Sequence, residues 1–144
     1  MGANLFTDDE LSYLQTQRMA RLATIGPGGG PQVRPVVFEL NLDLDAIEIG
    51  GWDMGSTQKF RNVKKDPRVS IVIDDVVCFE PFIDRGIEVR GLAEAISDYG
   101  PLRQGYSPEI IRIYPRRLIS WGLVPGSPAI TARNVGTVRG KGML

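Results

Sequence analysis

The chain has 144 residues and a mass of 15.8 kDa, which predicts a single domain, 1–144, with a core of its own. Its 17 basic and 17 acidic side chains cancel, which argues against a polycation built to bind nucleic acid. It has no histidine and one cysteine, which excludes histidine-based triads, histidine-ligated metals and disulfide frameworks. The lone thiol and the absence of a long apolar run predict a cytoplasmic protein with no membrane span and no metal site.

The first predicted element is a helix. Thr7 and Glu10 have the spacing of a capping box, in which Thr7 is the N-cap and Glu10 closes the box from the third helical position. Phe6 and Leu11 flank them as a hydrophobic staple. The helix is expected to end near Arg18 and to cover one end of a sheet.

Short strands follow, with one more helix between them. The second helix is expected over residues 59–65, capped by Ser56 or Thr57 and stopped by Asp66 and Pro67. Strands are predicted at residues 20–25, 32–40, 46–50, 68–74, 86–96, 109–114 and 117–123. Many short strands at regular spacing indicate a mainly β (α+β) fold, either a small barrel or a sandwich.

Three segments leave alternatives open. Residues 76–82 either extend the strand before them or pair with it as a hairpin. Residues 109–123 form two strands separated by Pro115, or one strand bent there. The tail, 124–144, is rich in glycine and proline, and it either lies loose or packs at the interface with a partner subunit.

The segment with the richest chemistry is 50–61, which joins a strand to the start of the second helix. Helix N-termini collect unpaired N–H donors and the positive end of the helix dipole, and therefore attract anions. Thr57 and Lys59 are close enough in sequence to reach one phosphate from the first turn. The alternative is a capped helix with solvated lysines.

Cations concentrate along the same helix. The run consists of Lys59, Arg61, Lys64, Lys65 and Arg68, opposed only by Asp66. It is either a solvated helix face or a landing site for an anionic ligand tail.

Two further residues are candidates. Arg34 shares a strand face with Val36 and Phe38, and on a buried face it would need an anionic partner such as a phosphate or Glu39. Trp121, next to Gly122, either floors a planar cofactor or packs in the core.

Four segments together resemble a known family. Residues 20–36, with their Gly-rich turn, look like the opening of the pyridoxamine 5′-phosphate oxidase-like split barrels. Residues 59–70 match that family's Lys-x-x-x-apolar-x-x-[Asn/Asp]-Pro-x-Val segment. Residues 113–123 and 132–135 look most like the branch that uses coenzyme F420.

The resemblance implies a six-stranded antiparallel split β-barrel (an FMN-binding split barrel) with a few short helices. It also implies a homodimer with two cofactor sites between the subunits. In that arrangement Lys59, Ser56 and Thr57 hold the cofactor phosphate, and Arg34 joins them. Residues 33–37, including Pro35 and Val36, run beside the cofactor ring, and Arg61 and Trp121 complete the predicted cofactor-binding set.

The predicted function is therefore that of an F420H2-dependent reductase, which transfers hydride to a small planar unsaturated substrate. The alternatives are an FMN-dependent oxidoreductase of the same fold and a carrier that binds a flavin or deazaflavin without turnover. The missing histidine argues against pyridoxamine phosphate oxidase activity itself and against haem handling. No side chain is assigned as catalytic, and neither a nucleic acid nor a membrane is expected as partner.

Overall fold

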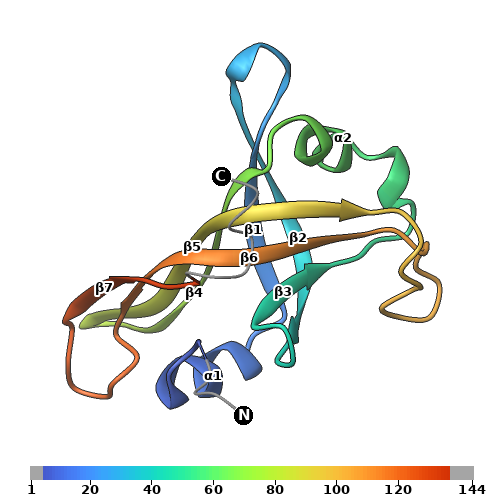
Figure 1. Cartoon of the computed structure of the whole chain (residues 1–144). Helices are drawn as coiled ribbons and strands as arrows, with labels where there is room; N and C mark the ends of the chain where they lie inside the picture. Colours follow the sequence, from blue (N-terminus) through green and yellow to red (C-terminus); the bar gives the residue numbers. More distant parts are fainter. Residues whose placement is uncertain (1–4, 137–144) are drawn as a thin grey trace.

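Antiparallel strands dominate the computed structural model, which describes residues 5–136 (Figure 1). Two α-helices and two short 3-10 helices, η1 and η2, accompany them. In chain order the elements are α1 (Asp8–Gln15), β1 (Met19–Ile25), η1 (Pro27–Gly29), β2 (Pro31–Asn41), β3 (Ala46–Ile49), η2 (Met54–Ser56), α2 (Gln58–Lys65), β4 (Arg68–Phe79), β5 (Phe82–Ile96), β6 (Ile110–Trp121) and β7 (Ile130–Asn134). The predicted mainly β fold is confirmed.

The strand pairings close into a ring. The sheet order is β3-β2-β1-β4-β5-β6-β7, and β3 also pairs with β6. Six strands therefore form a split barrel, with β7 attached to the second half of β6. The β1–β4 and β3–β6 ladders contain only three residue pairs each, whereas β4–β5 and β5–β6 run almost the whole length of their strands. The predicted six-stranded antiparallel split barrel is confirmed.

The N-terminal capping predicted from the sequence is present at both α-helices. The Thr7 hydroxyl accepts a hydrogen bond from the Glu10 N–H at 3.1 Å, and the Glu10 carboxylate accepts one from the Thr7 N–H at 2.9 Å. Of the two residues considered as the cap of α2, the structure selects Thr57, whose hydroxyl accepts from the Phe60 N–H.

The structure settles the first two open alternatives, and packing of the tail at a partner subunit stays a prediction. Residues 76–79 extend β4, and the hairpin turns at Glu80 and Pro81 into β5. β6 is one continuous strand, and its register against β5 shifts by one residue beside Pro115. The tail contributes β7, a strand that the sequence did not predict, while residues 137–144 lie outside the described part of the chain.

A hydrophobic core fills the ring. Its fully buried members are mainly isoleucines and leucines from alternate positions of the strands, among them Leu22, Ile47, Ile71, Ile87 and Ile113. Alternation places one face of each strand inward. Neither α-helix within residues 5–136 is long and apolar enough to cross a membrane.

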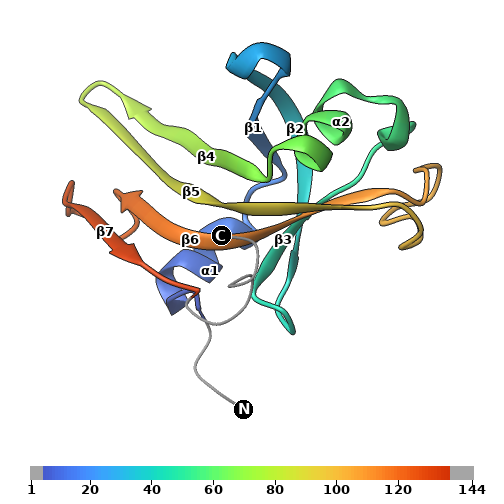
Figure 2. The same ribbon diagram turned by 45° about the horizontal axis from the view of Figure 1, so that its top comes forward.

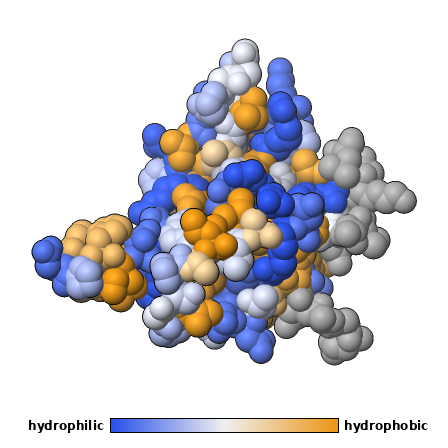
Figure 3. All heavy atoms as spheres, turned by 90° about the vertical axis from the view of Figure 1, so that its left-hand side faces the viewer, coloured by the Kyte–Doolittle hydropathy of each residue, from blue (hydrophilic) through white to orange (hydrophobic). Residues whose placement is uncertain are grey.

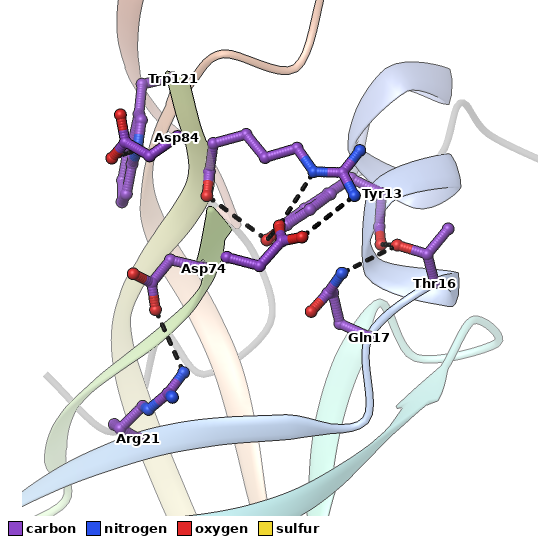
Figure 4. A network of polar contacts seen from close by, with 9 residues as sticks. Tyr13, Thr16, Gln17, Arg21, Asp74, Asp84 and Trp121 are labelled. Carbon is purple, nitrogen blue, oxygen red and sulfur yellow. Dashed lines mark hydrogen bonds and ion pairs between the residues drawn. The ribbon is translucent and has the colours of Figure 1, made fainter. Parts of the chain in front are cut away.

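Helix α1 is tied to the strands by polar contacts as well as by its apolar face. The Tyr13 hydroxyl donates to Asp75 at 2.8 Å, and Arg85 forms an ion pair with the same carboxylate at 2.9 Å (Figure 4). On the other side Arg133 of β7 forms a two-pronged ion pair with Glu10, both contacts at 2.7 Å. Glu10 is only 2% exposed. These contacts hold α1 between the β4–β5 hairpin and β7.

Two hairpins project from the ring. The β1–β2 hairpin rises beside α2, and the β4–β5 hairpin extends as a long arm (Figures 1 and 2). The end of this arm carries exposed apolar side chains at Val77, Phe79, Phe82 and Ile83. Viewed from the left of Figure 1, apolar atoms cover much of the arm where it projects (Figure 3).

Candidate functional site

A pocket of about 610 Å³ opens between the β1–β2 hairpin and the start of α2. It draws its lining from two segments far apart in the sequence, the hairpin around Gln32 and the first turn of α2. The lining residues are Thr24, Gln32, Val33, Arg34, Thr57, Gln58 and Lys59. The strand and the helix terminus that the sequence analysis singled out therefore meet at one place.

Asn62 joins α2 to the hairpin behind this pocket. Its side-chain amide donates to Thr24 Oγ1 and to Gln32 Oε1, both at 2.9 Å. Its oxygen accepts from Gln58 Nε2 at 2.7 Å. Because Asn62 is buried and both ends of its amide are used, this polar group is satisfied and fixes the separation of helix and hairpin.

The charge of the pocket is positive. Arg34 lies directly across the ladder from the buried Leu22, on the same side of β2 as the buried Val36 and Phe38. Although its cross-strand neighbour Leu22 is buried, Arg34 itself is exposed, and it lines the pocket instead of entering the core. Neither Arg34 nor Lys59 takes part in any of the ion pairs formed within residues 5–136.

The pKa of Lys59 reflects this positively charged environment. Partial burial lowers the pKa of the Lys59 ammonium, and the neighbouring positive charge of Arg34 lowers it further. Two like charges that face one pocket without a carboxylate between them destabilise each other. An anion bound between them would relieve this repulsion, so the arrangement favours a phosphate or a similar group.

The helix terminus adds backbone donors. The first N–H groups of an α-helix have no acceptor within the helix, and α2 begins at Gln58 in the pocket wall. The Thr57 hydroxyl itself donates to the Met54 carbonyl at 2.7 Å while it caps the helix. Thr57 therefore accepts the Phe60 N–H, and the N–H groups of Gln58 and Lys59 are the first-turn donors left without an acceptor inside the helix.

A second, smaller pocket of about 390 Å³ lies on the other side of Gln58. It is formed by the tip of the β1–β2 hairpin and the outer face of α2, and its charged residues are Arg61, Lys65, Asp66 and Arg68. Asp66 and Arg68 form an exposed ion pair at 2.7 Å, which leaves Arg61 and Lys65 as the net positive charge. We call the first pocket the inner pocket and this one the outer pocket.

The predicted cofactor-binding residues do not all line one pocket. Arg34, Thr57 and Lys59 line the inner pocket. Arg61 lines the outer pocket, where its guanidinium donates to the Ser56 carbonyl at 2.7 Å and to Gln58 at 2.9 Å. Ser56 is exposed beside them on the approach to α2.

Three predicted residues lie apart from both pockets. Val36 is buried in the core, because its side of β2 faces inward below Arg34. Pro35 points to the opposite side of the strand from Arg34. Trp121 lies at the far end of β6, where its indole N–H donates to Asp84 at 3.1 Å and its ring closes over Gly86 (Figure 4). Within this chain Trp121 packs at the end of the sheet, and its place beside a planar cofactor stays a prediction.

Sequence reasoning missed Thr24, Gln32, Gln58 and Asn62. One signal was present for Asn62, which lies between the apolar residues Phe60 and Val63 on the inward side of α2. A polar residue at a buried helical position needs partners. Their identity depends on how the helix packs on the hairpin, which the sequence pattern does not specify.

The closed ring of six strands and the cationic pocket at the start of α2 define the class, a split barrel of the pyridoxamine 5′-phosphate oxidase type. Residues 6–141 match the family model described as pyridoxamine 5′-phosphate oxidase. The chain therefore belongs to the pyridoxamine 5′-phosphate oxidase family.

The chain is similar in sequence to one reductase and in structure to several solved proteins. The chain is 44% identical over 119 residues to a 5a,11a-dehydrotetracycline/5a,11a-dehydrooxytetracycline reductase of Streptomyces rimosus, covering 82% of this chain and 84% of that protein. Among solved structures, an F420 reductase is 26% identical with a TM-score of 0.50, over 70% of this chain and 88% of its own. A conserved hypothetical protein of Mycobacterium tuberculosis has the same fold, with a TM-score of 0.64 at 22% identity, covering 85% and 89%.

Proposed function

We propose that this protein is an F420-dependent reductase that acts on an electron-poor double bond of a planar organic substrate. The observation that carries the proposal is the facing pair Arg34 and Lys59, unpaired by any carboxylate within residues 5–136, at the N-terminus of α2. The kinship with a tetracycline-type reductase and the likeness to an F420 reductase support it.

The residues fit a phosphate-bearing cofactor. Arg34, the Lys59 ammonium and the backbone N–H groups of Gln58 and Lys59 would hold the phosphate. Asn62 fixes the spacing of the hairpin and the helix that carry these groups. Val33 provides exposed apolar surface beside the charged groups. A reduced deazaflavin supplies hydride to an acceptor, and the protein orients and shields that chemistry.

The outer pocket favours F420 over FMN. F420 carries a polyglutamyl tail beyond its phosphate, whereas FMN ends at the phosphate. Arg61 and Lys65 place positive charge in the outer pocket, which adjoins the inner pocket at Gln58. A tail that leaves a phosphate in the inner pocket would continue into this outer pocket. FMN as the cofactor and a carrier without turnover remain the alternatives against which the proposal is tested.

The test is a titration of the purified chain with F420 and with FMN, separately, at low and moderate salt. We expect tighter binding of F420, and a dissociation constant for F420 that rises with salt more steeply than that for FMN. The reason is that exposed charges are screened over about 10 Å at 0.1 M salt. Lys65→Ala should weaken F420 binding and leave FMN binding unchanged.

Lys64→Ala is the matched control, because Lys64 belongs to the same helix but lies outside both pockets, over the Phe60 ring. Preference for FMN would move the function to the flavin alternative. Tight binding of F420 with no reduction of any unsaturated acceptor would favour the carrier. Binding of neither cofactor would contradict all three.

We also propose that the protein functions as a homodimer through the β4–β5 arm. Val77, Phe79, Phe82 and Ile83 expose apolar surface on a projecting hairpin, and such surface marks a contact site on a soluble protein. Light scattering is expected to give about twice the mass of 15.8 kDa. The double variant Phe79→Ser, Phe82→Ser should shift this value to the monomer, and a wild-type monomer at micromolar concentration would contradict the proposal.

A further inference from the structure

Trp52 is the most exposed tryptophan of the chain, with 76% of its surface accessible. Tryptophan side chains are usually well buried because of their large apolar area. This one lies in residues 50–57, the segment that leads from β3 into α2 and ends at the inner pocket. Trp52 and Thr57 are five positions apart, so their Cα atoms lie within about 18 Å of each other.

The segment around Trp52 is held against the β5–β6 connection. The Ser107 N–H donates to the Gly51 carbonyl at 2.9 Å, and the Met54 N–H donates to the Ser107 hydroxyl, also at 2.9 Å. Figures 1 and 2 both show this connection beside the entry to α2. The backbone that carries Trp52 is therefore anchored on either side of it.

The indole ring itself is positioned by two neighbours in the same connection. The Tyr106 ring meets it at 70°, with ring centroids 5.5 Å apart. Gly105 has φ of +89°, and a Cβ there would lie 2.6 Å from the indole Cζ3. Glycine thus allows the backbone to approach the edge of the ring, while most of the ring surface stays open to solvent.

A fixed and exposed indole is a surface for stacking planar rings. Aromatic pairs in stacked or edge-to-face geometry contribute about 0.5–1.5 kcal/mol beyond their buried area. Because the ring is already positioned, a ligand that stacks on it does not have to order it first. No aromatic side chain within residues 5–136 lines the inner pocket, and Phe60 beside Lys59 is buried, so Trp52 is the nearest exposed aromatic side chain along the chain on the α2 side of the pocket.

We propose that Trp52, positioned by Tyr106 and Gly105, binds the substrate by stacking and selects planar fused-ring molecules over small single-ring acceptors. This inference rests on the proposed function, because the substrate is placed beside a cofactor held by Arg34 and Lys59. It narrows the substrate class to polycyclic compounds with a conjugated, electron-poor double bond. Trp52 acts on affinity and selection and takes no part in the hydride transfer itself.

The experiment measures the affinity of tetracycline, a stable fused-ring probe, for the F420-loaded protein by isothermal titration calorimetry. Trp52→Ala is expected to weaken tetracycline binding about tenfold, which corresponds to about 1.4 kcal/mol. Trp52→Phe should retain most of the affinity. The matched control is Tyr99→Ala, which removes an exposed aromatic ring from the same connection, where it packs under Arg112.

A second measurement needs no change at Trp52. The chain has two tryptophans, so in Trp121→Phe all tryptophan emission comes from Trp52. Bound tetracycline should then protect this emission from acrylamide quenching. Steady-state kinetics should show the Trp52→Ala effect in KM for a fused-ring acceptor and not for cyclohex-2-en-1-one.

The outcomes separate this inference from the proposed function. F420 affinity should be the same in Trp52→Ala and wild type, in contrast to Lys59→Ala. Unchanged tetracycline affinity in Trp52→Ala, or wild-type protein that binds F420 but not tetracycline, would overturn the inference and leave the cofactor assignment standing. Failure of the wild type to bind F420 would instead overturn the proposed function.

Discussion

Replacing Lys59 with alanine is expected to raise the dissociation constant of F420, and of FMN, by about 10- to 100-fold. A hydrogen bond to a charged group contributes about 1.5–3 kcal/mol, and each 1.4 kcal/mol is a factor of ten in affinity. Lys59 is partly buried in the inner pocket, so water replaces its charge poorly. Fluorescence or calorimetric titration of the purified variant measures the change.

Lys64→Ala removes the same charge from the same helix and should change neither dissociation constant by more than about twofold, since exposed charges are well screened. Equal losses in the two variants would mean that α2 attracts anions only through its overall charge. Unchanged affinity in Lys59→Ala would show that the inner pocket is not the phosphate site.

The lowered pKa of Lys59 adds a signature in pH to this prediction. Burial and the charge of Arg34 lower the pKa in the free protein, and a bound phosphate would raise it again. The complex therefore holds more protons than the free protein, and cofactor affinity should fall as pH rises through the free-state pKa of Lys59. Lys59→Arg, which stays charged, should remove this fall while it keeps part of the affinity.

The second large effect is on stability. Glu10→Gln is expected to lower the free energy of unfolding at pH 7 by about 2–3 kcal/mol, because it leaves Arg133 without its carboxylate at a buried contact. Glu39→Gln is the matched control. The Glu39–Arg103 pair at 3.0 Å is largely solvated, with side chains 37% and 42% exposed, and its loss should cost less than about 1 kcal/mol.

This stability difference should depend on pH in a defined direction. Burial raises the pKa of the Glu10 carboxyl, but hydrogen bonds from Arg133 and Thr7 outweigh it, so the folded-state pKa lies below the ordinary value of 4.5. A carboxyl whose pKa is lowered by folding contributes stability above its unfolded-state pKa and loses it as pH falls through the folded-state pKa. Thermal melting of wild type and Glu10→Gln should therefore converge in acid, and a constant difference would contradict the ion pair as its cause.

Glu10 also illustrates what the sequence can and cannot predict. Its role in the capping box follows from a spacing of three residues, and the structure confirms it. Its ion pair with Arg133 joins residues 123 positions apart, and no local pattern indicates it. The same distinction explains β7, whose exposed residues carry no strand signal and which forms because β6 offers it a free edge.

In the candidate site, too, local sequence patterns predict some features, while others depend on contacts between distant segments. Helix capping predicts that α2 starts at Ser56 or Thr57, with Lys59 in its first turn, and strand alternation predicts the side of β2 that carries Arg34, because each depends on a local pattern. The polar contacts behind them, from Asn62 to Thr24 and Gln32, depend on how α2 packs against the hairpin. Trp121 could be placed only once its neighbours Asp84 and Gly86 were known, since a tryptophan beside a glycine fits a ligand floor and a packed strand end equally well.

The two short ladders of the ring have a mechanical consequence. The strands form two larger halves, β3-β2-β1 and β4-β5-β6, which are joined by only three residue pairs at each of the β1–β4 and β3–β6 ladders. A small rotation of one half against the other breaks few backbone hydrogen bonds, so the barrel is softest along these two lines. Thr24 lies one residue beyond the β1–β4 ladder, and it borders the inner pocket. The inner pocket thus borders one of the two lines along which the ring has the fewest backbone pairings, and the contacts of Asn62 with Thr24 and Gln32 tie α2 to the hairpin beside it.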